Sequence, residues 1–244
     1  MTISLPLLLA SASPRRRQLL QLLGLPFTVA VAPVDEDAAL DRYRGPIEEL
    51  APWLAKHKAA AALSLPEAAD RLVITADTTV LLHEEVLGKP RDKAHARELL
   101  LSLRGRRHHV VTGVAVSYLE SQRANEADAS TADAVRLAER RYRVNGRHRI
   151  ESASCITPVL MRSYSEEEID SYIASNDPLD KAGAYGVQHP GFQPTKRIDG
   201  CYLNVVGLPL CVLVDLLAEF NVYPVIQGGR RTPTGCPWSE KCLT

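Results

Sequence analysis

The sequence predicts an α/β fold with a mixed sheet. Apolar segments typical of buried strands alternate with segments that have the apolar spacing and the start and stop signals of helices. A short polar turn at 83–85 separates two apolar stretches, 72–82 and 86–90, and predicts a hairpin, so part of the sheet should be antiparallel. The 244 residues fit one large domain or two small ones and can bury a substantial core.

The remaining expected strands are short apolar stretches between turn residues, and they cover 5–10, 27–33, 109–118, 154–164 and 201–206. Two segments between these elements are expected to be loops. The first is the acidic stretch at 34–37, and the second is 176–188, which is rich in charge and glycine.

The expected helices cover 14–23, about 47–63, 93–104, a stretch after Ser165 and a last helix up to about 219. Pro52 marks either a kink or the true start of the second helix. The other helices carry local start or stop signals: Ser13 with Pro14 and then Gly24, Asp92, a capping box of Ser165 with Glu168, and Pro209.

We expect one domain over residues 1–223. Within it, the polar and non-periodic stretch at about 119–149 is expected to be a surface insertion that ends in a hairpin turn at Asn145-Gly146. Residues 224–244 are rich in Pro, Gly and Arg and are expected to form a flexible C-terminal tail.

Composition limits the classes of function. Twenty-nine basic residues balance 29 acidic ones, which argues against the basic field that bulk nucleic-acid binding needs. Five cysteines without a C-x-x-C pair signal neither a disulfide framework nor a zinc site. No apolar run approaches the roughly 20 residues of a membrane span. The N-terminal stretch LPLLLASAS resembles a signal peptide but follows no basic residue, so we interpret it as a buried strand and expect a cytoplasmic protein.

Three arginines follow the first helix start, in the stretch SASPRRR at 11–17. The helix N-terminus is already positive there, so the arginines would repel their own backbone unless an anion binds. We therefore predict a phosphate site made by Ser11, Ser13, helix N–H groups and the guanidinium groups of Arg15 and Arg16. The alternative is a solvated basic first turn.

Other charged residues stand in unusual places. Lys58 lies at the edge of an apolar helix stripe, and Asp77 interrupts a strand that otherwise suits burial, so it needs a cation or a metal as partner. Glu36 and Asp180 could add oxygen ligands for a divalent metal, Mg or Mn, of the kind polyphosphate chemistry uses. The alternatives are a snorkelling lysine, an aspartate that caps a strand end, a solvated acidic loop and, for Lys89 and Lys181, ordinary surface lysines.

Seven stretches together resemble the Maf family of nucleoside triphosphate pyrophosphatases, in the family's order: SASPRRRQLLQLLGLPF, VDED, ITADTTV, GKP, TGVAV, PLDKAGAYGVQ and VVGLPL. The resemblance implies a fold like that of inosine triphosphate pyrophosphatase, with two lobes around a cleft. It also implies metal-dependent hydrolysis of a nucleoside triphosphate to the monophosphate and diphosphate. By this match Asp77 is the proton acceptor, Glu36 the acidic residue after the second strand, and Lys58, Lys89 and Lys181 the cleft lysines.

The resemblance also suggests a substrate. Family members that act on dTTP and UTP have Arg, Thr and Gln where this chain has Arg15, Thr78 and Gln188, whereas those that prefer 7-methyl-GTP have Trp, Gln and Glu. This chain departs from the family pattern after Gln188, where His189-Pro190-Gly191 replaces a glycine-rich run. The stretch 119–149 also exceeds the usual linker, and the tail has no counterpart.

We therefore expect a pyrophosphatase for dTTP and UTP, and for modified pyrimidine triphosphates as further candidates. Asp77 would take a proton from water, ligate metal, or do both. The other hypotheses are the same reaction on 7-methyl-GTP, a non-catalytic nucleotide-binding regulator of septum formation, and a single-strand nucleic-acid binder, which 5% aromatic residues disfavour. The expected partner is a small-molecule nucleoside triphosphate, with no nucleic acid and no membrane; a homodimer is left open.

Overall fold

The computed structural model describes residues 5–119, 142–144 and 148–224. Its centre is an eight-stranded sheet with the order β2-β1-β3-β5-β7-β6, in which β4 also pairs with β3 and β8 with β7. The strands are β1 Leu7–Ala10, β2 Phe27–Ala30, β3 Leu72–Leu82, β4 Glu85–Leu87, β5 Arg107–Leu119, β6 Tyr142–Val144, β7 His148–Met161 and β8 Thr195–Ile198. β1 runs parallel to β2 and β3 while the other pairs are antiparallel, which confirms the mixed sheet and the predicted hairpin.

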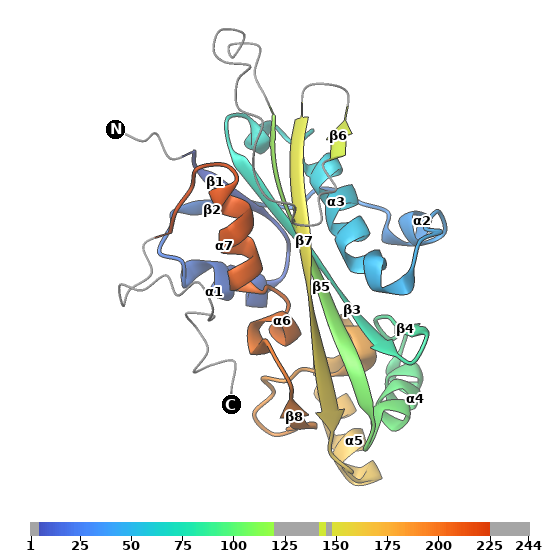
Figure 1. Ribbon diagram of the computed structural model, residues 1–244. Helices are drawn as coiled ribbons and strands as arrows, with labels where there is room; N and C mark the ends of the chain where they lie inside the picture. The colour runs from blue at the N-terminus through green and yellow to red at the C-terminus, as the bar shows by residue number, and fades with distance from the viewer. Residues whose placement is uncertain (1–4, 120–141, 145–147, 225–244) are drawn as a thin grey trace, which may run out of the picture.

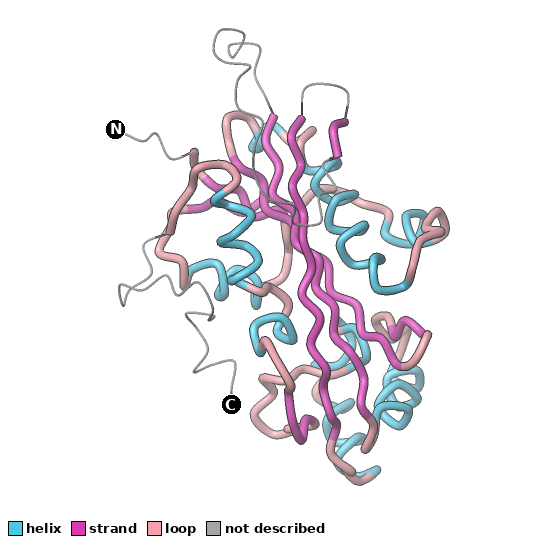
Figure 2. Tube along the Cα trace, viewed as in Figure 1, coloured by secondary structure: helices cyan, strands magenta, loops and turns pink. Residues whose placement is uncertain are grey.

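The helices flank this sheet (Figure 2). They are α1 Pro14–Gln21, α2 Glu36–Leu40, α3 Leu50–Ala62, α4 Lys93–Leu103, α5 Glu166–Ala174, α6 Tyr202–Val206 and α7 Leu210–Ala218, with 3₁₀ turns η1 Ile47–Glu49, η2 Pro66–Ala68, η3 Asp177–Asp180 and η4 Ala182–Ala184. The predicted caps are confirmed: the Ser13 and Asp92 side chains accept from the backbone three residues on, and Ser165 and Glu168 form the capping box. Pro52 lies in the first turn of α3, where its missing N–H costs nothing.

Three long strands, β3, β5 and β7, run the length of the molecule (Figure 1). At one end α1 and α7 pack on one face of the sheet and α3 on the other, and their leucine-rich and alanine-rich faces form two hydrophobic clusters. At the opposite end α4 and α5 form a third cluster with the far ends of the same strands. The fold is thus α/β, with two helix-covered regions that share one sheet.

A gap in the strand pairing positions the site. β1 pairs with residues 72–74 of β3, and β4 pairs with residues 80–82. Within the described part of the chain, residues 75–79 of β3 therefore have a strand neighbour on the β5 side alone. Asp77 lies in the middle of this open stretch.

The packing of α3 depends on a glycine. A Cβ atom added to Gly113 of β5 would lie 2.3 Å from both N and Cα of Pro52, so only glycine allows this approach. Gly113 is the register partner of Asp77 across the sheet. The close contact therefore holds α3, which carries Lys58, over the open stretch of β3.

Some expectations about the elements were wrong. Residues 201–206 form helix α6 rather than a strand, because buried Asn204 bonds the carbonyl of Val110, the N–H of Thr112 and the hydroxyl of Thr157, and these bonds pin a short helix against β5 and β7. The acidic stretch expected to be a loop contains the start of α2, where the Asp35 side chain accepts from the N–H of Ala38. Strand β8 was not expected at all.

Two expectations fall outside the described residues. Most of the insertion expected at 119–149 falls at 120–141 and 145–147, which the structure does not describe. The tail from residue 225 onward also lies outside the described residues. The strands on either side of Asn145-Gly146 do pair antiparallel, with Val144 opposite His148. None of the described helices combines the length and the apolar character that a membrane crossing requires.

Candidate active site

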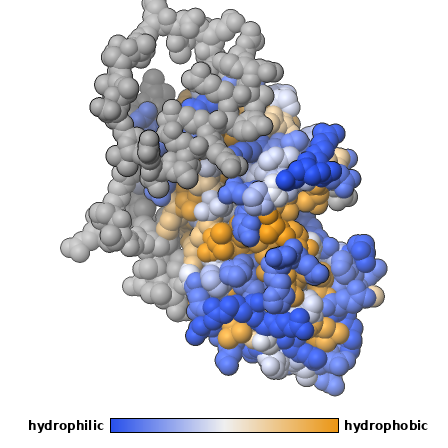
Figure 3. Space-filling view, turned by 45° about the vertical axis from the view of Figure 1, so that its right-hand side comes forward, coloured by the Kyte–Doolittle hydropathy of each residue, from blue (hydrophilic) through white to orange (hydrophobic). Residues whose placement is uncertain are grey.

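A cavity of about 1000 Å³ opens at the gap in β3. The structure gathers every residue that the sequence predicted for the site around it: Ser11, Ser13, Arg15, Arg16, Glu36, Lys58, Asp77, Thr78, Lys89, Asp180, Lys181 and Gln188. In the space-filling view, hydrophobic residues gather in the hollow between the two regions of the molecule (Figure 3). Apolar lining residues include Val31, Leu40, Leu54 and Val86. The cavity thus combines charged groups with an apolar wall.

The start of α1 forms one side of the cavity. Ser13 Oγ accepts from the N–H of Arg16, and Ser11 Oγ accepts from the N–H of Ser13. The Arg16 side chain folds back across this turn and binds other elements: Nε donates to the carbonyl of Gly207 at 2.9 Å and Nη2 to Oγ1 of Thr78 at 3.1 Å. Burial lowers the pKa of Arg16, and the nearby Asp77 carboxylate partly opposes this.

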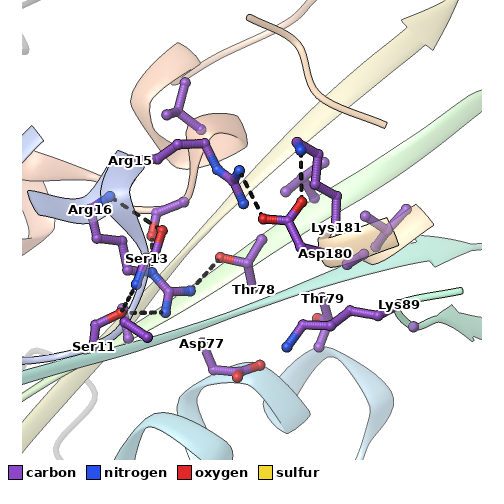
Figure 4. A pocket seen from close by; sticks show the side chains of 18 of the residues that line it. Ser11, Ser13, Arg15, Arg16, Asp77, Thr78, Thr79, Lys89, Asp180 and Lys181 are labelled. Atoms are coloured by element: carbon purple, nitrogen blue, oxygen red, sulfur yellow. Dashed lines mark hydrogen bonds and ion pairs between the residues drawn. The ribbon is translucent and has the colours of Figure 1, made fainter. Parts of the chain in front are cut away.

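The three arginines thus differ in their surroundings. Arg16 holds α1 to β3 and to the end of α6, so protein groups already occupy much of its guanidinium. Arg15 extends across the cavity, where its Nη1 lies 3.5 Å from Oδ2 of Asp180 (Figure 4). Arg17 is exposed. Of the three, Arg15 and Arg16 line the cavity.

Lys58 links the two acids on the α3 side. Its Nζ lies 2.5 Å from Oδ1 of Asp77 and 2.8 Å from Oε1 of Glu36, and the Asp77 and Lys58 side chains are only 11% and 16% exposed. Lys89 Nζ lies 3.8 Å from the other oxygen of Glu36. Burial raises the pKa of Glu36, but the hydrogen bond and charge of Lys58, with the charges of Lys89 and Arg16, outweigh it and leave the pKa below its ordinary value. Glu36 is therefore ionised at neutral pH.

A second charged cluster forms the opposite wall. Lys181 Nζ lies 2.7 Å from Oδ1 of Asp180 and 2.9 Å from Oδ1 of Asp177. Asp180 lies between Arg15 and Lys181 (Figure 4). Burial raises the pKa of Asp180, but the hydrogen bond and charge of Lys181 and the charge of Arg15 bring it below its ordinary value. Two cations thus share one carboxylate.

The other two predicted specificity residues lie on different walls. Thr78 Oγ1 is 3.0 Å from Oγ1 of Thr112 and also accepts from Arg16, so its position is fixed. Gln188 makes a hydrogen bond with Tyr202. Burial raises the pKa of Tyr202, and the bond with Gln188 partly opposes this rise. His189, the departure from the family pattern, is held by its own loop, because its Nδ1 accepts from the N–H of Phe192 at 2.8 Å.

Comparison with known sequences identifies the family. The sequence model of the Maf-like proteins matches residues 6–220. The chain belongs to this family. Its relatives include proteins named dTTP/UTP pyrophosphatase from Bacillus anthracis (strain CDC 684 / NRRL 3495), 38% identical over 216 residues, and from Pelotomaculum thermopropionicum, 40% identical over 215 residues. Each alignment covers 88% of this chain and 96% of the relative. A Bacillus cereus protein of the same name is 38% identical, with 88% of this chain and 90% of the relative covered.

Some residues of this Maf-like site were missed from the sequence. Asp177 and Tyr185 line the cavity, and Tyr172 bonds the wall that carries Lys181. The signal available for Asp177 was its place directly before the stretch PLDKAGAYGVQ. Tyr172 carries no comparable signal, since its ring has the spacing of an ordinary core residue of α5.

The three carboxylates predicted to bind a metal belong to two different charged clusters, Glu36 and Asp77 at Lys58 and Asp180 at Lys181. Among the described residues, no three histidine, cysteine, aspartate or glutamate side chains form a group that could hold a metal ion. Glu36 and Asp77, however, both reach a single ammonium group, and paired carboxylates with remaining positions open to phosphate and water suit Mg²⁺. Asp180 pairs with Arg15 and Lys181 instead, and its role as a third ligand stays a prediction.

Proposed function

We propose that this Maf-like protein hydrolyses dTTP and UTP, and modified pyrimidine triphosphates of the same shape, to the nucleoside monophosphate and diphosphate. The names of the relatives support this proposal. The observation that carries it is Asp77, a nearly buried carboxylate at the open stretch of β3, in a cavity that five lysine and arginine side chains also line. A triphosphate brings about four negative charges, which such a set of cations can offset.

In the proposed mechanism Asp77 is the proton acceptor. The attacking water gives its proton to the Asp77 carboxylate as the bond between the α-phosphorus and the bridging oxygen breaks and diphosphate leaves. Lys58 fixes the orientation of Asp77 through Oδ1. Lys89, Lys181, Ser11, Ser13 and Arg16 would bind the phosphate oxygens, and the exposed Lys89 can turn toward the ligand more freely than Arg16.

A divalent cation, Mg or Mn, belongs to this proposal. When bound, it would offset charge on the phosphates and on the leaving oxygen. We propose Glu36 and Asp77 as its ligands, and Asp180 as a third ligand only if it leaves Arg15 and Lys181. Lys58 would then have to yield part of its contact with both carboxylates.

Arg15, Thr78 and Gln188 would select the base. The Gln188 amide can both accept and donate and so can match the O2, N3–H and O4 edge of uracil or thymine. Adenine and guanine do not present this edge, and a site built to hydrogen-bond a base discriminates against one that leaves its polar groups unpaired. We therefore propose a strong preference for dTTP and UTP over purine triphosphates.

Diphosphate release from a panel of triphosphates tests the proposal. The panel contains dTTP, UTP, CTP, ATP, GTP and 7-methyl-GTP, each with Mg²⁺, with Mn²⁺ and with EDTA. We expect the highest kcat/KM for dTTP and UTP and little turnover with EDTA. A higher kcat/KM for 7-methyl-GTP would contradict the substrate, and binding without turnover would favour a nucleotide-binding regulator.

We also propose a cytoplasmic location, where these nucleotides are found. Sedimentation of the purified chain at several concentrations tests the homodimer.

A further inference from the structure

The cavity wall at residues 177–188 contains two 3₁₀ turns and little other regular structure. It nevertheless carries Lys181 and Gln188, two of the residues proposed to contact substrate, and Asp180, a proposed metal ligand. Gly183 within it has a positive φ of 68°. Such a segment needs contacts from outside itself to hold its side chains toward the cavity.

One buried hydroxyl supplies such contacts. Tyr172, in the last turn of α5, is 2% exposed. Its ring stacks on that of Phe192, with the ring centroids 4.4 Å apart, and meets the ring of His189 edge-on, with the centroids 4.8 Å apart. Its hydroxyl accepts from the N–H of Gly186 at 2.9 Å and donates to Oδ2 of Asp177 at 2.7 Å. A single group thus ties both halves of the wall to α5.

The contact continues from Asp177 to Lys181. The other Asp177 oxygen, Oδ1, lies 2.9 Å from Nζ of Lys181, and the Asp177 backbone carbonyl also accepts from this ammonium. The Lys181 side chain is 10% exposed. A Cβ added to Gly186 would lie 2.8 Å from Cε of Lys181, so the stem of the lysine passes directly over this glycine. The ammonium therefore has little freedom to move.

We propose that Tyr172 and Asp177 are positioning residues that hold the Lys181 ammonium where it binds a phosphate group of the substrate. The inference rests on the proposed function, because it takes a phosphate as the partner of Lys181. Neither residue reacts. The hydroxyl of Tyr172 orients Asp177, and Asp177 orients Lys181.

Tyr164 provides a matched control. It is also almost fully buried, its ring also packs on Phe192, at 5.1 Å, and its hydroxyl donates to the carbonyl of Leu100 at 2.6 Å. It does not line the cavity. Tyr172→Phe and Tyr164→Phe each remove one buried hydroxyl and keep the ring, so both should lower the melting temperature. Tyr172→Phe should lower it more, because its hydroxyl makes two hydrogen bonds and that of Tyr164 makes one.

The experiment measures kcat and KM for dTTP, and the affinity for inorganic pyrophosphate by calorimetry in EDTA. For Tyr172→Phe we expect KM to rise about tenfold with kcat changed less than about threefold, and pyrophosphate affinity to fall about tenfold. Asp177→Asn should change both quantities in the same direction. Tyr164→Phe should leave both at the wild-type value.

Equal KM and equal pyrophosphate affinity in Tyr172→Phe and Tyr164→Phe would overturn the proposal. The binding measurement needs no turnover and so separates the two claims. If the wild type releases no diphosphate from dTTP but Tyr172→Phe still weakens pyrophosphate binding, the positioning role stands and the proposed function fails. If the wild type turns over dTTP and Tyr172→Phe behaves identically, the positioning role alone fails.

Discussion

Lys58 of α3 places its ammonium 2.5 Å from the carboxylate of Asp77 on β3. The two side chains meet because α3 packs directly on the sheet at Gly113, the register partner of Asp77. The same ammonium also contacts Glu36, so it stands between two carboxylates at the open stretch of β3. This relationship makes Asp77 an oriented carboxylate inside a cavity.

Asp77→Asn should lower kcat for dTTP by about 10²-fold or more, because the amide keeps the shape but cannot accept the proton. Folding should survive, since Lys58 retains Glu36 as a partner. Steady-state kinetics and a thermal melt check both expectations. Near-normal turnover in a folded variant would refute the role of Asp77.

Arg16→Ala should destabilise the protein without ligand by about 1–3 kcal/mol, because the buried carbonyl of Gly207 would lose its donor. The helix dipole alone predicts a gain in stability, because the substitution removes a cation from the positive start of α1. Arg17→Ala is the control, because Arg17 is exposed on the same first turn. Urea denaturation of both variants shows whether the hydrogen bond to Gly207 or the helix dipole has the larger effect. An unchanged or raised stability for Arg16→Ala would show that the dipole dominates.

Gly113→Ala should cost about 3 kcal/mol or more, because the new methyl group would overlap the backbone of Pro52 and push α3 from the sheet. Movement of α3 would also shift Lys58 away from Asp77. Gly88→Ala is the matched control, since a Cβ there meets nothing within 4 Å. Equal denaturation midpoints for the two variants would contradict the close packing described above.

Asp180→Asn should tighten the binding of inorganic pyrophosphate in EDTA several-fold. The carboxylate now neutralises part of the charge of Arg15 and Lys181. Its removal frees Arg15 for the anion and leaves Lys181 with Asp177 as its carboxylate partner. Asp170→Asn is the control, because Asp170 pairs with Arg97 outside the cavity.

Unchanged or weaker affinity of Asp180→Asn would contradict the counter-ion role. A metal titration of dTTP turnover on the same variant tests the other prediction for Asp180. If Asp180 ligates the cation, the metal concentration for half-maximal rate should rise.

His108 should make stability depend on pH. Burial lowers the pKa of His108 from its ordinary value near 6.5 to about 4. At pH values between these two, the unfolded chain binds a proton at this side chain and the folded chain does not. Stability should therefore fall as pH drops through this window, by up to about 3 kcal/mol. In His108→Gln the slope of unfolding free energy against pH should be flatter. In His109→Gln, at an exposed neighbouring position, the slope should change less, because the charge of His109 is a smaller cause of the shift than burial. An identical slope in His108→Gln would exclude this contribution.

The sequence predicts local features of this fold better than distant ones. Asp77 was found because a charge interrupts an apolar strand, and Lys58 because it borders a helix stripe; both signals depend on nearest neighbours. The contact of Arg16 with Gly207 joins residues 191 positions apart and has no local pattern. Helix α6 was mistaken for a strand because the bonds that fix Asn204 come from β5 and β7.

The long strands limit how the cavity can open. β3, β5 and β7 pass through both helix-covered regions, so the two sides of the cavity are not separate bodies joined by a hinge (Figure 1). Drawing them apart would bend three paired strands and strain their ladder of backbone hydrogen bonds. Rotation of a rim side chain such as Lys89 breaks only an exposed ion pair, which contributes little. Entry of a nucleotide should thus require rearranged side chains on a nearly rigid frame.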